Sequence, residues 1–457
     1  MAGQERKPTY EELLRENEEL RRLVEDLSKR LKEAERKIEE LQAVAYRQAA
    51  PFRIAPERRQ SAPGRPGRKA GHRGQCRMAP DHVDEDRVVP LEHCPHCGGP
   101  VQGARPLVQY IEDIPPVKAH VTRLVTYVGQ CPRCGEVRSS DPLQVSTAGG
   151  CARVQIGPRA LGLAAQLKAE LGLPYRKLSR VLAHWGLRVS AGGLSQALAR
   201  VAARLRGNYY GIAQAIRASP VVNADETSWY VGRPGWWLWV FATPERTLYV
   251  VNEGRGAAVV EGVLGKDYGG TLVSDCLSSY DPIQCRKHKC YSHHLRALSD
   301  WMERVPAAGA AVLKDMRLYL QTAMVLAKER PHMTEETFTR RAQALRQTVD
   351  GLLDAPQTAL GIDKALNRFR THRAHLFGLL DDPRVPATNN LAERMLRPAV
   401  ISRKVSCGNK TARGRRTWQI LCSVAATCRQ QEESFLELVA ATMPLTSHPA
   451  HQTPVAG

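Results

Sequence analysis

The sequence predicts a multidomain α/β protein, and three observations support that class. A charged segment near the N-terminus repeats apolar residues every three or four positions, as coiled coils do. Two copies of the motif Cys-Pro-x-Cys-Gly follow at 94–98 and 131–135. Beyond residue 220, β-rich runs alternate with helical ones and carry carboxylates. No single pattern spans the chain, so we expect separate units in that order.

The composition favours a polyanionic partner. The 457 residues include 66 Lys and Arg against 46 Asp and Glu, a formal charge of +20, and nucleic acid is the commonest partner of so basic a chain. A hydrophobic share of 43% excludes wholesale disorder. The longest apolar run, 236–243, is far short of the roughly 20 residues of a membrane span. We expect a soluble, cytoplasmic, nucleoid-associated protein without a secretory signal or membrane partner.

Residues 9–46 are predicted to form a parallel, dimerising coiled coil. The apolar positions are separated alternately by four and three residues over about five heptads. Asn17 is the single polar residue at an a position, a feature that fixes register and favours two strands. The alternative is an amphipathic helix that lies on its own globular domain. The seam consists of Leu13, Asn17, Leu20, Val24, Leu27, Leu31, Ala34, Ile38, Leu41 and Ala45.

Residues 47–82 are predicted to be a basic, flexible linker. Prolines, glycines and arginines dominate it, and Glu57 is the one acid between 47 and 80. Arg65, Arg68 and Lys69 are the candidate DNA contacts. They loosely match a motif whose extended Arg side chains insert into the DNA minor groove. We favour the alternative, in which they contact phosphates whatever the DNA sequence.

Residues 83–150 are predicted to form a zinc ribbon that binds DNA. Cys94 and Cys97 precede Cys131 and Cys134 by 33 intervening residues, and two such thiolate pairs complete a tetrahedral structural zinc site. We expect short strands at 108–110, 117–121 and 124–128. A redox pair or unrelated free thiols is the alternative, which the duplication of the motif disfavours.

Residues 151–210 are predicted to form a helical module of helix-turn-helix type. One helix covers 174–185, a Gly-bearing turn follows at 186–190, and a second helix covers 191–205 with Ser190 as its N-cap. Gln196 and Arg200 are expected to be exposed. The same spacing occurs in structural helical hairpins, so it predicts a DNA reader no more strongly than a scaffold.

The segment from 211 to 300, continued at 381–431, is predicted to be the catalytic domain. Strands are expected at 220–227, 236–243, 246–251 and 270–275, with a helix at 256–264. This order is typical of the ribonuclease-H-like fold, whose first and fourth strands lie side by side. Asp225 and Asp275 would then be neighbours, and Glu393 is the candidate third acid, on a helix capped by Thr388 or Asn389.

Three such acids suit two-metal phosphoryl transfer. Mg²⁺ and Mn²⁺ prefer oxygen ligands, and two ions can clamp the attacking and leaving oxygens. Asp225, Asp275 and Glu393 are therefore the candidate catalytic residues and magnesium ligands. Each acid taken singly would be read as an ordinary surface carboxylate.

Four motifs carry a resemblance to a known family. They are Ala224-Asp225-Glu226-Thr227, Ser274-Asp275, Cys290-Tyr-Ser-His293 and Asn389-Asn390-Leu-Ala-Glu393-Arg394-Met-Leu-Arg397-Pro398. With the order of the units, they resemble the large transposases of the insertion sequence sixty-six family. The resemblance implies a DDE transposase with the triad Asp225, Asp275 and Glu393, and a helical insertion at 301–380.

Several features of that resemblance stay open. His294 follows His293, and residues 402–406 lack an aromatic, both departures from the family pattern. Cys290 and His293 either bind a metal or pack near the second acid. Residues 432–457 are expected to form a helix and a tail.

No acid occurs between Arg394 and Arg429, and basic residues accumulate there. Arg394, Arg397, Arg403 and Lys404 are candidate DNA-backbone contacts beside Glu393, although a charge run is often only a solvated face. The predicted function is cleavage of element ends and strand transfer into target DNA by a homodimer or higher oligomer, with small accessory proteins as further candidate partners. The alternatives are a related nuclease or resolvase, and a zinc-ribbon regulator with an inactive catalytic domain.

Overall fold

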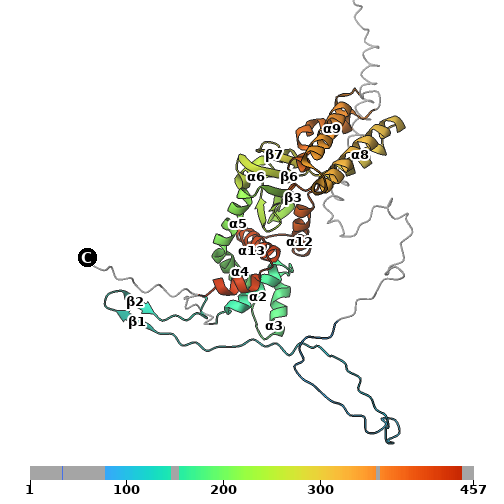
Figure 1. Ribbon diagram of the computed structural model, residues 1–457. Coiled ribbons are helices and arrows are strands. Elements are labelled where there is room, and N and C mark those ends of the chain that lie inside the picture. Colours follow the sequence, from blue (N-terminus) through green and yellow to red (C-terminus); the bar gives the residue numbers. More distant parts are fainter. Residues whose placement is uncertain (1–32, 34–77, 146–153, 357–360, 445–457) are drawn as a thin grey trace, which may run out of the picture. The chain divides into compact units, whose positions relative to one another are not determined.

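The computed structural model describes residues 33, 78–145, 154–356 and 361–444 (Figure 1). The predicted coiled coil at 9–46 lies outside these residues apart from Glu33, which is helical. The linker lies outside them as far as residue 77, with Arg65, Arg68 and Lys69. The chain divides into two units, one ending at Pro115 and one beginning at Pro116, and each is described by itself.

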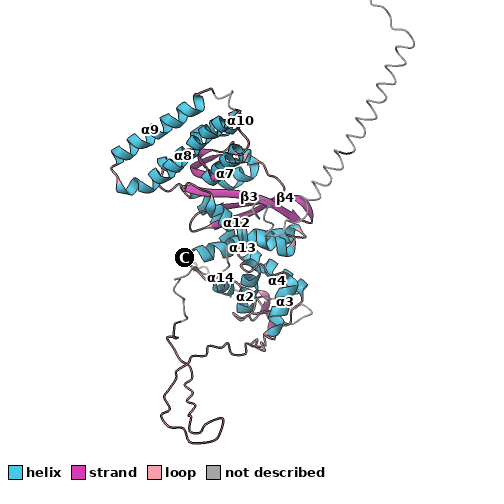
Figure 2. Ribbon diagram, turned by 90° about the vertical axis from the view of Figure 1, so that its right-hand side faces the viewer, coloured by secondary structure: helices cyan, strands magenta, loops and turns pink. Residues whose placement is uncertain are grey.

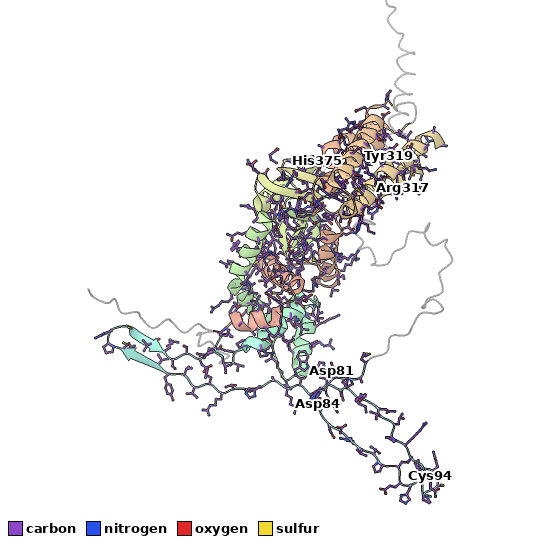
Figure 3. The ribbon with its side chains drawn as sticks, viewed as in Figure 1. Asp81, Asp84, Cys94, Arg317, Tyr319 and His375 are labelled. Carbon is purple, nitrogen blue, oxygen red and sulfur yellow. The ribbon has the colours of Figure 1, made fainter. Side chains whose placement is uncertain are left out.

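The first unit contains the turn around Cys94 (Figure 3). The Cys94 amide donates to the Gly99 carbonyl at 2.7 Å, and the Gly98 amide donates to the Cys94 carbonyl at 2.9 Å. Gly98 has φ +73°, a conformation that glycine adopts without strain. Backbone amides of His96 and Cys97 lower the pKa of the Cys94 thiol. The turn therefore favours the thiolate, the form that binds metals.

The second unit begins with a hairpin around the second cysteine pair. Strands β1 (Val128–Cys131) and β2 (Gly135–Arg138) are antiparallel, and Cys131 pairs with Gly135. Backbone amides of Arg133 and Cys134 lower the pKa of Cys131. In both turns, the backbone amides two and three residues further along therefore lower the pKa of the first cysteine.

The strands predicted at 108–110 and 117–121 are wrong, and of the strand predicted at 124–128 only Val128 is found in β1. Val108, Ile111 and Val121 are exposed. A short strand is stable only where its apolar face is covered, and nothing within the described part of either unit covers these side chains.

Among the residues described between 154 and 220, four helices precede the sheet: α2 (Pro158–Ala169), α3 (Tyr175–His184), α4 (Ala191–Arg204) and α5 (Arg206–Ala218). The predicted pair of helices is α3 and α4. The Ser190 hydroxyl caps α4 by accepting from the Gly193 amide at 3.0 Å, as predicted. Gly186 has φ +82° and ends α3, which allows the tight turn between the helices.

A five-stranded sheet follows, in the order β5-β4-β3-β6-β7. Its strands are β3 (Val221–Val231), β4 (Arg233–Ala242), β5 (Thr247–Asn252), β6 (Asp267–Ser274) and β7 (Gln284–Lys289), and α6 (Ala257–Leu264) joins β5 to β6. β3, β4 and β5 are antiparallel, whereas β6 and β7 run parallel to β3. The expected neighbours β3 and β6 are indeed paired.

Helices complete the second unit: α7 (Tyr291–Met302), α8 (Ala307–Glu329), α9 (Glu335–Asp354), α10 (Asp363–Thr371), α11 (Gly378–Asp381), α12 (Asn390–Ser406), α13 (Ala412–Gln430) and α14 (Phe435–Thr442). Short 3₁₀ turns lie at Ser278–Tyr280, Arg330–His332 and Arg373–His375. The long pair α8 and α9 extends from the sheet as an antiparallel hairpin (Figure 2). Among the described helices, none is both long and apolar enough to cross a bilayer.

Three apolar cores hold these elements together. One core joins the helices before the sheet to one face of it, with Leu178, Leu194 and Ile216 beside Val222 and Phe241. The helix-turn-helix pair therefore shares its core with the sheet.

The opposite face of the sheet packs on α12 and α13 through Trp229, Leu238, Ala392 and Trp418. A third core lies within the helical insertion and reaches Tyr291 of α7. Arg317 of α8 also donates to the Ser299 hydroxyl of α7.

Candidate active site

Two of the predicted acids lie at neighbouring parallel strands, Asp225 within β3 and Asp275 directly after β6. β3 and β6 pair Val221 with Thr271 and Asn223 with Val273. Continuing that register by two residues brings Asp225 beside Asp275, which directly follows β6. Asp225 is the cross-strand partner of Val240 in β4, and the Val240 side chain belongs to the core under α12. Both acids therefore lie at the α12 side of the sheet.

Asp225 has a strongly perturbed carboxyl. Burial and the charges of Glu226, Asp275 and Glu393 together raise its pKa to about 7, against a hydrogen bond from the Glu226 amide at 2.9 Å. Asp275 is half-buried and accepts from the Leu277 amide at 2.9 Å. The three predicted acids are thus within electrostatic reach of one another, and their negative charge is incompletely compensated.

Glu393 lies in the first turn of α12, and Asn389 fixes the start of that helix. The Asn389 side chain is fully buried. Its amide nitrogen donates to the Ala224 carbonyl at 2.7 Å, and its oxygen accepts from Asn223 at 2.9 Å. Asn389 occupies the predicted N-cap position, but its side chain makes no capping hydrogen bond because both its ends bind β3. It links the strand of Asp225 to the helix of Glu393.

Glu226 lies on the other face of β3, as the alternation of a strand requires. It pairs across the sheet with Trp239, a member of the opposite core. Its carboxylate, whose side chain is only 2% exposed, binds Arg255 at 2.9 Å and accepts from the Tyr280 hydroxyl at 2.8 Å. Glu226 therefore has local partners that Asp225 lacks.

Cys290 and His293, at the start of α7, lie beside Glu393. One ligand atom from each of these three residues lies within 4.8 Å of the others, and in the described chain they form the one such group of possible metal ligands. The three carboxylates do not form so compact a group. Cys290 is fully buried, and its sulfur accepts from the Asn389 amide at 3.1 Å.

His294, the departure from the family pattern, turns away from this group. It is fully buried between α7 and the insertion, where Arg368 donates to its Nδ1 at 3.3 Å and its ring lies 4.9 Å from that of Phe369. Burial lowers its pKa far below the usual value. His294 therefore attaches the insertion to the site.

The family model described as "Transposase IS66 family" matches residues 153–417. That range includes Asp225, Asp275 and Glu393 and more than half of the chain. The chain belongs to the IS66 transposase family. It is similar to two uncharacterized proteins of Sinorhizobium fredii, y4qI and y4jD, at 24% identity each. The matches cover 62% and 72% of this chain, and 58% and 70% of those proteins respectively.

In this IS66 family member, the predicted DNA contacts on α12 differ in exposure. Arg394, Arg397 and Lys404 are exposed. Arg403 is half-buried and donates to the Thr227 hydroxyl at 3.2 Å and the Ser228 hydroxyl at 2.9 Å. Arg403 therefore binds β3 beside the site, whereas the other three face solvent.

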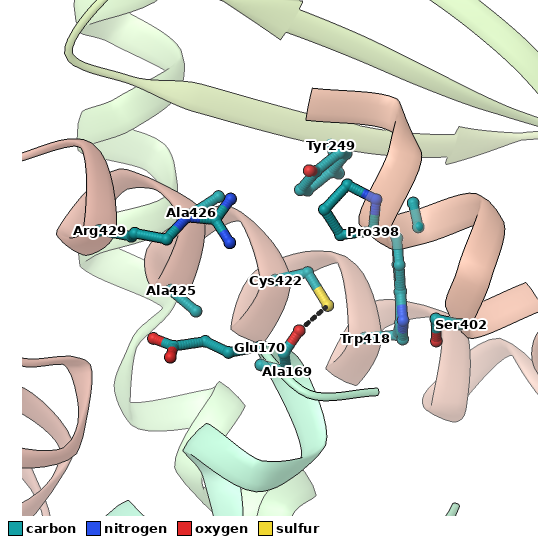
Figure 4. Close-up of a pocket in the computed structure, with 11 residues that line it drawn as sticks. Ala169, Glu170, Tyr249, Pro398, Ser402, Trp418, Cys422, Ala425, Ala426 and Arg429 are labelled. Atoms are coloured by element: carbon teal, nitrogen blue, oxygen red, sulfur yellow. Dashed lines mark hydrogen bonds between the residues drawn. The ribbon is translucent and has the colours of Figure 1, made fainter. Parts of the chain in front are cut away.

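A small cavity lies between α2, α12, α13 and β5 (Figure 4). Its volume is about 20 Å³, and Tyr249, Pro398, Trp418 and Cys422 are among its lining residues. Such a volume holds about one water molecule. It is too small for a substrate, so the candidate site is the open carboxylate group and not this cavity.

The sequence does not predict the burial and partners of two residues near the acids. It predicts a cap at Asn389, whose buried partners on β3 are visible only in the fold. Lys289 is fully buried on β7 and binds Asp281 at 3.0 Å. Its strand reads Gln-Cys-Arg-Lys-His-Lys, which gives no apolar signal for a buried strand.

Proposed function

We propose that this chain is an active DDE transposase that cleaves DNA at the ends of its element and joins them to target DNA. The observation that carries the proposal is the convergence of Asp225 and Asp275 from paired strands with Glu393 from α12. Together with the family, this arrangement favours phosphoryl transfer over the other readings of the sequence.

The sheet supports a ribonuclease-H-like catalytic domain. Its first three strands are antiparallel, its fourth and fifth are parallel to the first, and the order is β5-β4-β3-β6-β7. In this proposal the helices α8, α9 and α10 are an insertion between the second acid and the third.

The chemistry of the donor set fits magnesium or manganese. The three residues offer carboxylate oxygens, and the raised pKa of Asp225 reflects negative charge that a cation would compensate. When bound, two such ions supply activation of the attacking oxygen and stabilisation of the leaving oxygen. Asp225 and Asp275 hold their positions through the sheet, Glu393 through α12, and Asn389 keeps strand and helix in register.

Exposed cations beside Glu393 are proposed to hold the DNA backbone. Arg394, Arg397 and Lys404 present charge next to the acids, and Arg403 holds β3. In this proposal the protein is a homodimer or higher oligomer held by the coiled coil. It also binds one structural zinc through Cys94, Cys97, Cys131 and Cys134. The similar local electrostatics of the two cysteine turns supports that zinc site.

The test is an assay of cleavage and joining with a DNA fragment that carries the element end. We expect Asp225→Asn, Asp275→Asn and Glu393→Gln to reduce cleavage by several orders of magnitude while DNA affinity changes little. Glu226→Gln is the matched control, because it removes a neighbouring charge from the other face of the strand. Cleavage without joining by the wild type would favour a nuclease, and binding without cleavage would favour a regulator.

A further inference from the structure

The ligand set beside Glu393 differs in kind from the three carboxylates. Cys290 offers a thiolate, His293 an imidazole nitrogen and Glu393 a carboxylate, all within 4.8 Å of one another. Thiolate and imidazole select zinc-class cations, whereas magnesium prefers oxygen alone. Glu393 belongs to both groups.

The surroundings of Cys290 favour a ligating thiolate. Cys290 is fully buried at the N-cap of α7. The Asn389 amide donates to the sulfur at 3.1 Å. A backbone N–H aimed at sulfur stabilises negative charge there without occupying the position of a metal.

His293 is poised toward the same point. Its Nδ1 is buried and has no hydrogen-bond partner among the described residues. Cys290 is the N-cap of α7 and His293 lies three positions further along, so both side chains lie on one side of the helix start.

We propose that Cys290, His293 and Glu393 form a binding site for a zinc-class divalent cation, and that its occupation withholds Glu393 from Asp225 and Asp275. Three protein ligands leave one position of a tetrahedral ion for solvent. Zinc is then an inhibitor of the magnesium-dependent reaction, acting through the acid that both sites need. The inhibitory consequence rests on the proposed function, but the binding itself does not.

Cobalt binding to the full-length chain tests the site without DNA. Cobalt bound to a thiolate has a charge-transfer absorption, and the paired cysteines at 94–97 and 131–134 would contribute to it as well. All variants therefore keep those cysteines, and each is compared with wild type. When Cys290→Ser is saturated with cobalt, we expect its charge-transfer absorption to be smaller than that of wild type by the contribution of one thiolate. We expect His293→Gln to bind the cobalt ion of the proposed site at least about tenfold more weakly than wild type. Glu393→Gln should weaken it as well.

Cys285→Ser is the matched thiol control. Cys285 is a half-buried cysteine near the start of β7. Cys290 directly follows the end of that strand, five positions further along, and at roughly 3.3 Å per position the two cysteines lie about 16 Å apart. Cys285→Ser should bind cobalt as wild type does. Thermal unfolding checks that each variant is folded, and His293→Gln carries the test if Cys290→Ser is not. Equal cobalt spectra and affinities in the folded variants and wild type would overturn the proposal.

Inhibition of cleavage tests the consequence. At fixed Mg²⁺, with each protein normalised to its own zinc-free rate, His293→Gln should need at least about ten times more Zn²⁺ than wild type for half inhibition. Equal sensitivity would refute the inhibitory role. If Asp225→Asn cleaved normally, the proposed function would fail, whereas the cobalt spectra would still decide whether the cation site exists.

Discussion

At the scale of single residues, the charge on Asp225 opposes folding in the absence of a cation. Its pKa is about 7 in the folded protein and about 3.8 when unperturbed. Between these values the folded state holds a proton that the unfolded state has released, so stability falls as pH rises from about 4 to about 7. At pH 8 this shift lowers the free energy of unfolding of the metal-free protein by on the order of 4 kcal/mol at most.

We therefore predict that Asp225→Asn raises the melting temperature of the metal-free protein at pH 8. At pH 4 the gain should nearly vanish, because the wild-type carboxyl is protonated there. Mg²⁺ should raise the melting temperature of the wild type more than that of the variant. Differential scanning calorimetry at the two pH values measures both effects, and a variant less stable than wild type at pH 8 would contradict the burial argument.

Glu226 should behave in the opposite way. Glu226→Gln weakens the contacts with Arg255 and Tyr280, so we expect the free energy of unfolding to fall by about 1–3 kcal/mol. Cleavage should stay within about tenfold of wild type, since the side chain lies on the other face of β3. Urea unfolding and the cleavage assay decide the matter together. Loss of cleavage with unchanged stability would show that Glu226, not Asp225, faces the reacting DNA.

At the scale of secondary-structure elements, the register between β3 and α12 depends on Asn389. Asn389→Ala removes two buried side-chain hydrogen bonds and leaves Asn223 and the Ala224 carbonyl without these partners. We predict a loss of about 2–4 kcal/mol in unfolding free energy. At a temperature where the variant is still folded, the loss of stability alone would leave the cleavage rate unchanged. We expect the rate to fall there nevertheless, because Glu393 is displaced.

Asn390→Ala is the control for that prediction. Asn390 is exposed and is the first residue of α12. It has the same side chain as Asn389 but is exposed. Asn390→Ala should therefore change the free energy of unfolding and the cleavage rate little. Equal effects at the two positions would indicate a general weakening of the helix start and not a link to β3.

At the scale of the whole molecule, a formal charge of +20 makes DNA binding depend on salt. Replacing Arg394, Arg397 and Lys404 with Gln should lower the slope of log affinity against log salt by about 2–3, roughly 0.9 for each lost phosphate contact. The matched control replaces Lys314, Arg340 and Arg341, which are exposed on α8 and α9. Binding isotherms at several salt concentrations would contradict the proposed DNA path if both triple variants gave the same slope.

The sequence by itself determined the features that depend on local spacing. Ser190 before an amphipathic helix gives its cap, β-rich runs give β3 to β6, and their order places Asp225 near Asp275. These follow because caps and strand periodicity are set by a few neighbouring residues. The cysteine pairs likewise predict a zinc site from spacing alone, although the strands expected between them are wrong, because strands need a covered face that spacing does not supply.

Only the tertiary structure decided how the remaining polar residues are used. β7 is a charged segment that becomes an edge strand with its last three residues buried, because β6 offers its edge and Asp281 pairs with Lys289. Asn389 binds β3 instead of capping α12, and Glu393 lies within reach of Cys290 and His293 as well as of the other acids. The partners in these contacts lie eight to 166 residues apart in the chain. A side chain's burial and its partners are therefore properties of the packed fold, and the local sequence signals neither.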